Sequence, residues 1–351
     1  MPNIEDRKLT PKENYMRIVY PDLPMPEWAP MYTMGMPLPN GDAAPMAFVT
    51  PAIIGDPHMK MADGPDCWGV PWVGNYETGG AILPEPNNFL LEDIEDWHDV
   101  VKAPVYDADT DWEQMAKDDV KMMRIDRTKT ACALSMYVGA FQQFVAFMGF
   151  TEGLIAMYEE PEEVKAMITY INDFYISVGK KYIEYLKPDL LVMMDDTAAA
   201  GAPFMGEDLF REILVPQYKK TYEELAAPYG LNVQFHNCGM CADRMEILHE
   251  EAGVTVWDPA QEMNDLVGFK KKWGRKIALA GGWDPNLEDL EPGCPDEVLY
   301  ASVKHSFDTY APDGGYAFCG GLVGPIDDKD LQRKNATIMN AAIEIGNHFY
   351  D

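Results

Sequence analysis

Short apolar runs alternate with helical patterns along most of this chain, and this alternation constrains the fold more than any other feature. The runs lack clean alternation of apolar and polar residues, as expected when both faces of a parallel sheet are covered. Repeated strand–helix units over about 250 residues predict an α/β fold, a (β/α)8 TIM barrel, with a doubly wound open sheet as the alternative. The predicted strands are residues 132–138, 190–194, 232–235, 254–257, 277–280 and 315–318, and the clearest predicted helices are residues 160–181, 207–226, 242–252 and 295–310.

The first 45 residues differ in composition from the rest. A helical stretch at residues 11–20 is followed by a run dense in proline, which favours extended or looping backbone. We therefore expect residues 1–45 to form an N-terminal extension that covers part of the barrel, and residues 46–351 to form the barrel domain. Residues 57–92 contain a loop rich in glycine and proline.

Composition and charge exclude several classes of function. The chain carries 28 Lys and Arg against 58 Asp and Glu, a formal net charge of −30. Such a charge repels nucleic acid and anionic membranes, so neither is expected as a partner. We find no signal-like start and no apolar run of the ~18 residues that a membrane span requires. The six scattered cysteines are read as reduced thiols of a cytoplasmic protein.

Polar or metal-binding residues directly follow five of the predicted strands. In a barrel these positions converge at the C-terminal rim, where active sites of this fold lie. No glycine-rich phosphate-binding fingerprint follows any strand, so nucleotide binding has little support. The residues are Asp195 and Asp196, His236 and Cys238, Asp258, Trp283 and Asp284, and Cys319.

Among these residues, His236, Cys238 and Cys319 form a candidate zinc site. One imidazole and two thiolates can bind Zn²⁺ and leave its fourth position open, as in catalytic sites. That position would hold water, substrate or a carboxylate such as Asp195 or Glu152. Taken singly, His236 would more often be a hydrogen-bonded histidine at the rim, and Cys238 or Cys319 a small buried side chain.

Cys238 also stands in C-x-x-C spacing with Cys241, which would suit a redox pair or a zinc knuckle. The chain has no second C-x-x-C to complete a four-cysteine site, so this pairing is the weaker reading.

Other residues near the predicted strand ends are candidates for catalysis and substrate binding. Asp195 and Asp196 are candidate acids or bases. An apolar slot for an aromatic ring is expected at the barrel mouth, since that is where such pockets lie. Its candidate substrate-binding residues are Tyr137, Trp257, Trp283 and Asp284.

Several of these segments resemble the uroporphyrinogen decarboxylase superfamily. The resemblance covers about the last two thirds of the chain, and its His-x-Cys and distal Cys are similar to the zinc motif of the corrinoid-dependent methyltransferases. Here that motif falls on His236, Cys238 and Cys319. The segments that carry it are residues 189–196 (DLLVMMDD), 203–210 (PFMGEDLF), 236–239 (HNCG) and 280–285 (AGGWDP).

Four further segments narrow the resemblance to the methyltransferase I components of anaerobic O-demethylases. They are residues 9–14 (LTPKEN), 26–30 (PEWAP), 66–72 (DCWGVPW) and 257–265 (WDPAQEMND). The resemblance implies a zinc enzyme that moves a methyl group from a methoxylated aromatic compound to the cob(I)alamin of a separate corrinoid protein.

Two other activities stay open. The same motif serves methylcobalamin-dependent methylation of thiols, in which zinc lowers the pKa of a substrate thiol. A decarboxylase-like lyase is disfavoured, because the chain holds only eight arginines, none at a predicted strand end, whereas a polycarboxylate substrate needs such partners. A corrinoid carrier is also disfavoured, since no Asp-x-His-x-x-Gly segment resembling a cobalt-binding site is found.

Overall fold

The structure is a computed structural model that describes residues 7–36, 38, 41–55, 62–136 and 139–351. Its centre is a curled sheet of seven strands, in which every hydrogen-bonded pair runs parallel and each strand follows its neighbour in chain order. The strands are β1 (Met46–Val49), β5 (Ala131–Ser135), β6 (Leu190–Met194), β7 (Val233–His236), β8 (Val254–Ala260), β9 (Ala278–Gly282) and β10 (Tyr316–Cys319).

The predicted α/β barrel class is confirmed, although the described residues form seven strands in this sheet rather than eight. A segment from the N-terminal region occupies the space between β10 and β1. Met31 forms a parallel bridge with Phe318, whose amide donates to the carbonyl of Pro30 at 2.9 Å. An added Cβ on Gly35 would lie 3.2 Å from the backbone nitrogen of Phe48 in β1. The division at residue 45 stays a prediction.

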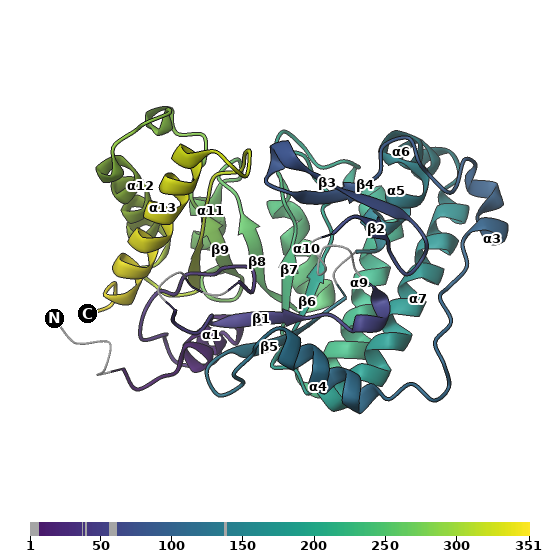
Figure 1. Ribbon diagram of the computed structural model, residues 1–351, viewed down its shortest axis with the longest axis horizontal. Helices are drawn as coiled ribbons and strands as arrows, with labels where there is room; N and C mark the ends of the chain where they lie inside the picture. The colour runs from purple at the N-terminus through teal and green to yellow at the C-terminus, as the bar shows by residue number, and fades with distance from the viewer. Residues whose placement is uncertain (1–6, 37, 39–40, 56–61, 137–138) are drawn as a thin grey trace.

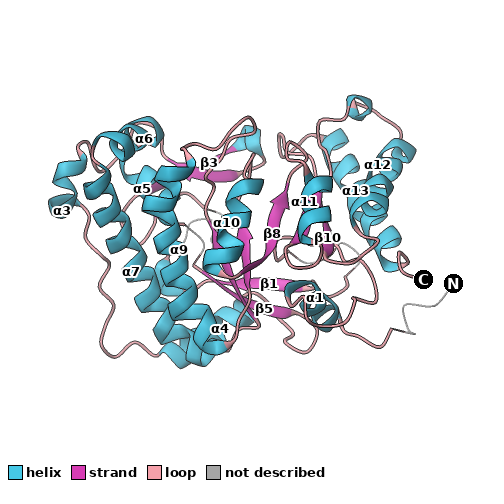
Figure 2. Cartoon of the chain, turned by 180° about the vertical axis from the view of Figure 1, so that it is seen from behind, coloured by secondary structure: helices cyan, strands magenta, loops and turns pink. Residues whose placement is uncertain are grey.

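Helices cover the outer face of the sheet (Figures 1 and 2). Their apolar stripes pack against outward-facing strand residues such as Cys132, Leu134 and Leu191. The helices are α1 (Pro11–Val19), α3 (Trp97–Val100), α4 (Trp112–Met122), α5 (Ala140–Met148), α6 (Phe150–Glu159), α7 (Pro161–Leu186), α8 (Glu207–Leu209), α9 (Val215–Thr221), α10 (Ala242–Ala252), α11 (Leu266–Trp273), α12 (Asp296–Tyr310) and α13 (Lys329–Asn347).

Helix α1 closes the N-terminal end of the barrel, opposite a small antiparallel sheet (Figures 1 and 2). It begins with a capping box, in which Thr10 accepts from the amide of Glu13, whose carboxylate accepts from the amide of Thr10. At its other end the carbonyl of Val19 accepts hydrogen bonds from Thr255 (2.7 Å) and Asn232 (2.9 Å), at the starts of β8 and β7.

Small side chains inside the barrel leave room for two tyrosines from the N-terminal region. Five inward-facing strand residues are alanines. Tyr15 and Tyr32 fill the space beside them, fully buried and stacked with their ring centroids 6.2 Å apart. The barrel interior is therefore a packed core below its C-terminal rim.

An antiparallel sheet lies on the C-terminal side of the barrel (Figure 1). Its turn reaches the loop after β10, because Tyr76 hydrogen-bonds Asp327 and Gly80 approaches the side chain of Ile326. The strands are β2 (Gly64–Pro65), β3 (Pro71–Asn75) and β4 (Ala81–Pro84). The remaining short elements are η2 (Ala52–Ile54), η3 (Tyr76–Thr78), η4 (Ile94–Asp96), η5 (Phe210–Leu214), η6 (Tyr222–Ala226), η7 (Ala227–Tyr229) and η8 (Glu288–Leu290).

The helix expected at residues 207–226 forms with two π-helical segments, η5 and η6. Pro216, the second residue of α9, has no backbone N–H to donate to the preceding turn. The missing hydrogen bond accounts for the π-helical geometry of η5, which lies just before it. Among the residues that the structure describes, no helix has both the length and the apolar character for crossing a membrane.

Candidate metal centre

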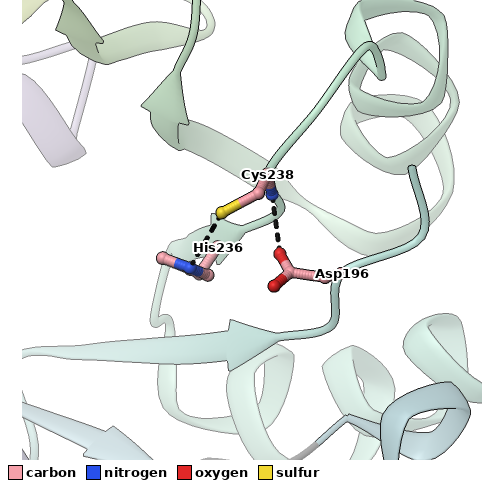
Figure 3. Close-up of side chains that lie close together, drawn as sticks. All are labelled: Asp196, His236 and Cys238. Atoms are coloured by element: carbon pink, nitrogen blue, oxygen red, sulfur yellow. Dashed lines mark hydrogen bonds between the residues drawn. The ribbon is translucent and has the colours of Figure 1, made fainter. Parts of the chain in front are cut away.

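Three possible metal ligands lie together at the C-terminal ends of β6 and β7 (Figure 3). Met194, the last residue of β6, pairs with His236, the last residue of β7. Asp196 and Cys238 each follow two residues later, so the shared register brings both to the side of His236. Within the described part of the chain, their ligand atoms form a cluster in which all lie within 4.8 Å of one another.

The distances in this cluster suit a zinc ion. Cys238 Sγ lies 3.6 Å from His236 Nε2. A tetrahedral zinc with usual Zn–N and Zn–S bonds separates these two ligand atoms by about 3.6 Å. The carboxylate of Asp196 is held beside them, because its Oδ1 accepts a hydrogen bond from the amide of Cys238 at 2.7 Å. Nitrogen, sulfur and oxygen donors of this kind fit zinc.

Asp258 orients the imidazole ring of His236 by contacting the ring nitrogen that does not face Cys238. Its Oδ1 lies 2.6 Å from His236 Nδ1, and the carboxylate is fully buried. A carboxylate only accepts, so Nδ1 carries the proton and Nε2 is left as the ligand atom facing Cys238. Burial lowers the pKa of His236, but Asp258 and Cys238 favour the charged ring, so the net effect raises the pKa well above its ordinary value.

A chain of buried hydrogen bonds continues from Asp258 to the floor of the barrel. Gln234 Nε2 donates to Asp258 Oδ2 at 2.5 Å, and Tyr15 Oη donates to Gln234 Oε1 at 2.7 Å. Gln234 and His236 are two residues apart on β7, so both point into the barrel. The N-terminal helix thus contributes to the support of the candidate ligand.

Asp195 lies next to the cluster but faces away from it. Its oxygens accept from the amides of Phe141 and Gln142 (both 2.9 Å) and from the hydroxyl of Tyr218 (2.7 Å), which fixes β6 to the start of α5. An added Cβ on Gly139 would lie 2.0 Å from Asp195 Cγ. Burial raises the pKa of Asp195 to about 7. Of the two candidate acids, only Asp196 joins the metal cluster.

The loop after β7 requires glycine at its turn. Gly239 has φ +91°, and an added Cβ would lie 2.5 Å from the carbonyl oxygen of Ala198. Asn237 joins the same two loops, since its side chain accepts from the amide of Thr197 (3.0 Å) and donates to that residue's hydroxyl (2.8 Å). The backbone around Cys238 is therefore held against the loop that carries Asp196.

The other cysteine of the C-x-x-C spacing is buried in this turn. Cys241 Sγ donates to the carbonyls of Asn237 (3.4 Å) and Gly239 (3.6 Å). Burial raises the pKa of its thiol. These contacts give Cys241 a structural role in the turn and do not support a redox pair with Cys238.

Cys319 lies at the end of β10 and packs against the barrel interior. It stands outside the 4.8 Å cluster of Asp196, His236 and Cys238. Burial, together with the charges of Asp258 and Cys238, raises the pKa of its thiol to about 12. Its place at the same rim is as expected, and its role as a ligand stays a prediction.

A cavity of about 720 Å³ opens at the C-terminal rim, between the ends of β8, β9 and β10 and the segment around Met31. Cys319, Trp283 and Asp284 line it, and the substrate-binding roles of Trp283 and Asp284 stay predictions. Trp257 does not line it, because this side chain is fully buried on the outer face of β8, packed against Phe269 with ring centroids 5.4 Å apart.

Two further candidates are not found at the cluster. Glu152, a possible fourth ligand, is exposed on α6. Tyr137 lies outside the described residues.

Sequence reasoning missed the supporting roles of Asp258, Gln234 and Tyr15. Asp258 was recognised only as one of several polar residues at a strand end. A usable signal for Gln234 was its position two residues before His236, since a polar residue there must face the barrel interior. Nothing local in the sequence of α1 connects Tyr15 with the site.

The chain is similar to one known family and to solved structures. Residues 76–321 match the family model described as uroporphyrinogen decarboxylase (URO-D). Among solved structures, a methyltransferase from Methanosarcina mazei is similar over 98% of this chain and 100% of its own, with 12% identity and a TM-score of 0.60. An Old Yellow Enzyme from Pichia sp. AKU4542 is similar over 65% of this chain and 73% of its own, with 13% identity and a TM-score of 0.35. No curated protein matches the sequence.

Proposed function

This chain belongs to the uroporphyrinogen decarboxylase (URO-D) family, and we propose that it is a zinc-dependent methyltransferase. In this proposal it moves a methyl group from a methoxylated aromatic compound to the cob(I)alamin of a separate corrinoid protein. The observation that carries the proposal is the 3.6 Å approach of Cys238 Sγ to His236 Nε2 at the barrel rim, with Asp258 behind the ring.

His236 and Cys238 would hold the zinc, and Cys319 would complete the ligand set that the family resemblance implies. When bound, zinc would supply Lewis acidity to the heteroatom of the methyl donor. The buried Asp258 keeps the imidazole in the orientation and tautomer that a ligand needs.

Asp196 would assist departure of the ether oxygen. This oxygen leaves poorly as an anion, so a proton supplied as the carbon–oxygen bond breaks lowers the barrier. Asp196 Oδ1 accepts from the amide of Cys238 at 2.7 Å, and Oδ2 accepts from Gln142 Nε2 at the longer distance of 3.4 Å, so Oδ2 would carry the proton. A group of this kind contributes typically 10²–10⁴-fold to the rate.

Two observations favour methyl transfer over the lyase activity for which the family is named. The structural relative of nearly full coverage is described as a methyltransferase. The described residues that line the cavity include no Arg or Lys, whereas a polycarboxylate substrate needs such partners.

The net charge of −30 suits a corrinoid protein that docks through basic residues.

The test measures zinc content and methyl transfer with the same protein samples. We expect about one zinc per chain, and we expect Cys238→Ser and His236→Ala to lose both zinc and transfer from phenyl methyl ethers to a corrinoid protein. Unchanged turnover in Cys238→Ser with zinc still bound would falsify the mechanism. Transfer from methylcobalamin to a thiol, without transfer from any ether, would instead establish the alternative activity, methylcobalamin-dependent thiol methylation.

A further inference from the structure

The cavity at the ends of β8, β9 and β10 has the size of a small-molecule site. Its volume of about 720 Å³ falls within the usual ~300–1,000 Å³ of ligand pockets. Cys319, at the end of β10, is part of its wall. Under the proposed function, in which Cys319 is a zinc ligand, a ligand in this cavity would reach the metal centre through this part of the wall.

Most of the cavity wall is apolar and polarizable. Methionines contribute from three parts of the chain, namely the segment before β1, the loop after β8 and helix α13. Trp283 adds an indole whose Nε1 donates to Ser302 at 3.0 Å, which fixes the ring. Methionine adapts its shape to a ligand and contacts aromatic rings favourably. The methionines are Met31, Met34, Met36, Met263 and Met339.

The charged groups on this wall all have one sign. Glu262 and Asp284 line the cavity, and no Lys, Arg or His is found among its described lining residues. Tyr310 donates to Glu262 Oε1 at 2.8 Å, and the amide of Asn286 donates to Asp284 Oδ1 at 2.8 Å, so both carboxylates are oriented. Burial and the charge of Asp284 raise the pKa of Glu262, whereas the hydrogen bond from Tyr310 and the charge of His305 lower it, with a net rise.

We propose that this cavity selects methyl donors that carry a positively charged substituent, such as an ammonium group on a methoxylated ring, and rejects donors that carry a carboxylate. The inference rests on the proposed function and names the substrate class within it. The ring would lie against the methionines and Trp283, and the cation would face Glu262 and Asp284. An anionic substituent would meet two like charges with no compensating cation on the described wall.

The test uses three ligands of nearly equal size: 4-methoxybenzylamine, 4-methoxybenzyl alcohol and 4-methoxybenzoate. Binding to the full chain is measured by calorimetry at pH 7.5, without a corrinoid protein. We expect the amine to bind about tenfold more tightly than the alcohol, because the carboxylates attract its charge, and the benzoate about tenfold more weakly than the alcohol, because they repel it.

A double variant and a matched control separate the effect of these two carboxylates on binding from the effect of the net charge of the protein. Glu262→Gln with Asp284→Asn should bring the three affinities within about threefold of one another. Glu113→Gln with Asp118→Asn changes the net charge equally on the exposed face of α4, and should preserve the order. Benzoate binding as tight as the amine, no binding of any of the three, or an order unchanged in the first double variant would overturn the inference. Binding in the expected order without methyl transfer would support the inference and refute the proposed function.

Discussion

Asp258 Oδ1 lies 2.6 Å from His236 Nδ1 inside the barrel, where the carboxylate is completely buried. The two residues pair in register on β8 and β7, so the sheet itself sets their separation. A buried carboxylate behind a ligating imidazole fixes the ring and makes it a stronger donor to a metal. The relationship therefore connects barrel geometry directly with metal affinity.

Replacing this carboxylate should weaken zinc binding without abolishing it. We expect Asp258→Asn to lower zinc affinity by about 10–100-fold, because the ring loses its anionic partner while keeping its position. Competition with a chromophoric chelator measures the affinity. Asp107→Asn, on an exposed loop, is the control and should leave it unchanged. Equal zinc affinity in Asp258→Asn and the control would show that the carboxylate does not act through the histidine.

The third ligand can be assigned by comparing Cys319→Ala with Asp196→Asn. We expect Cys319→Ala to lose zinc as fully as Cys238→Ala, since removal of a ligand opens the site. We expect Asp196→Asn to keep zinc and to lose about 10²–10⁴-fold in methyl transfer, since it removes the proton. Zinc content by mass spectrometry and single-turnover transfer rates decide between them. Zinc kept in Cys319→Ala and lost in Asp196→Asn would instead make Asp196 the third ligand.

The parallel strands and several helices could be predicted because their patterns are local. Residues 190–194 and 242–252 form a strand and a helix with the predicted bounds. Strand β1 was missed because it is a four-residue run whose place in the sheet depends on pairing with β5, about 85 residues away in sequence. The sequence pattern likewise does not show that the segment at Met31 runs along β10.

For the candidate site, the positions at strand ends could be predicted, but their partners could not. His236 and Cys238 follow from residue type and spacing, and the structure brings them together. Which carboxylate joins them depends on side-chain direction: Asp195 faces α5 and Asp196 faces the cluster, although they are adjacent in sequence. Side-chain direction also places Trp257 on the outward face of β8, away from the barrel mouth.

The turn that carries Cys238 should not tolerate a side chain at Gly239. We expect Gly239→Ala to lower the free energy of unfolding by about 1–3 kcal/mol, because the residue has φ +91° and its Cβ would strike the backbone of Ala198. Chemical denaturation measures this change, and zinc affinity should fall with it.

Gly201→Ala provides the comparison for this prediction. Gly201 lies in the neighbouring loop with no atom within 4 Å of an added Cβ. Its substitution should change the free energy of unfolding by no more than about 0.5 kcal/mol. Similar losses in the two variants would mean that close packing at Gly239 is not the cause.

The buried carboxyl of Asp195 should make stability depend on pH. Its pKa is raised to about 7 in the folded protein, whereas an exposed Asp has a pKa of about 3.9. Between these values the folded state holds a proton that the unfolded state has released, so this contribution to stability is complete below about pH 4 and is lost as the pH rises to about 7. The free energy of unfolding of the wild type, relative to Asp195→Asn, should therefore fall by about 1.4 kcal/mol per pH unit between pH 5 and 7.

Tyr218→Phe tests the origin of this effect. The hydroxyl of Tyr218 donates to Asp195 Oδ2 at 2.7 Å and so lowers the pKa of the carboxyl against the larger effect of burial. Removing the hydroxyl should raise that pKa further and extend the loss of stability to higher pH. Urea denaturation of the three proteins at pH 5, 6, 7 and 8 provides the comparison. A difference between wild type and Asp195→Asn that stays constant over this range would show that Asp195 is already ionised at pH 5, held so by the amides of Phe141 and Gln142.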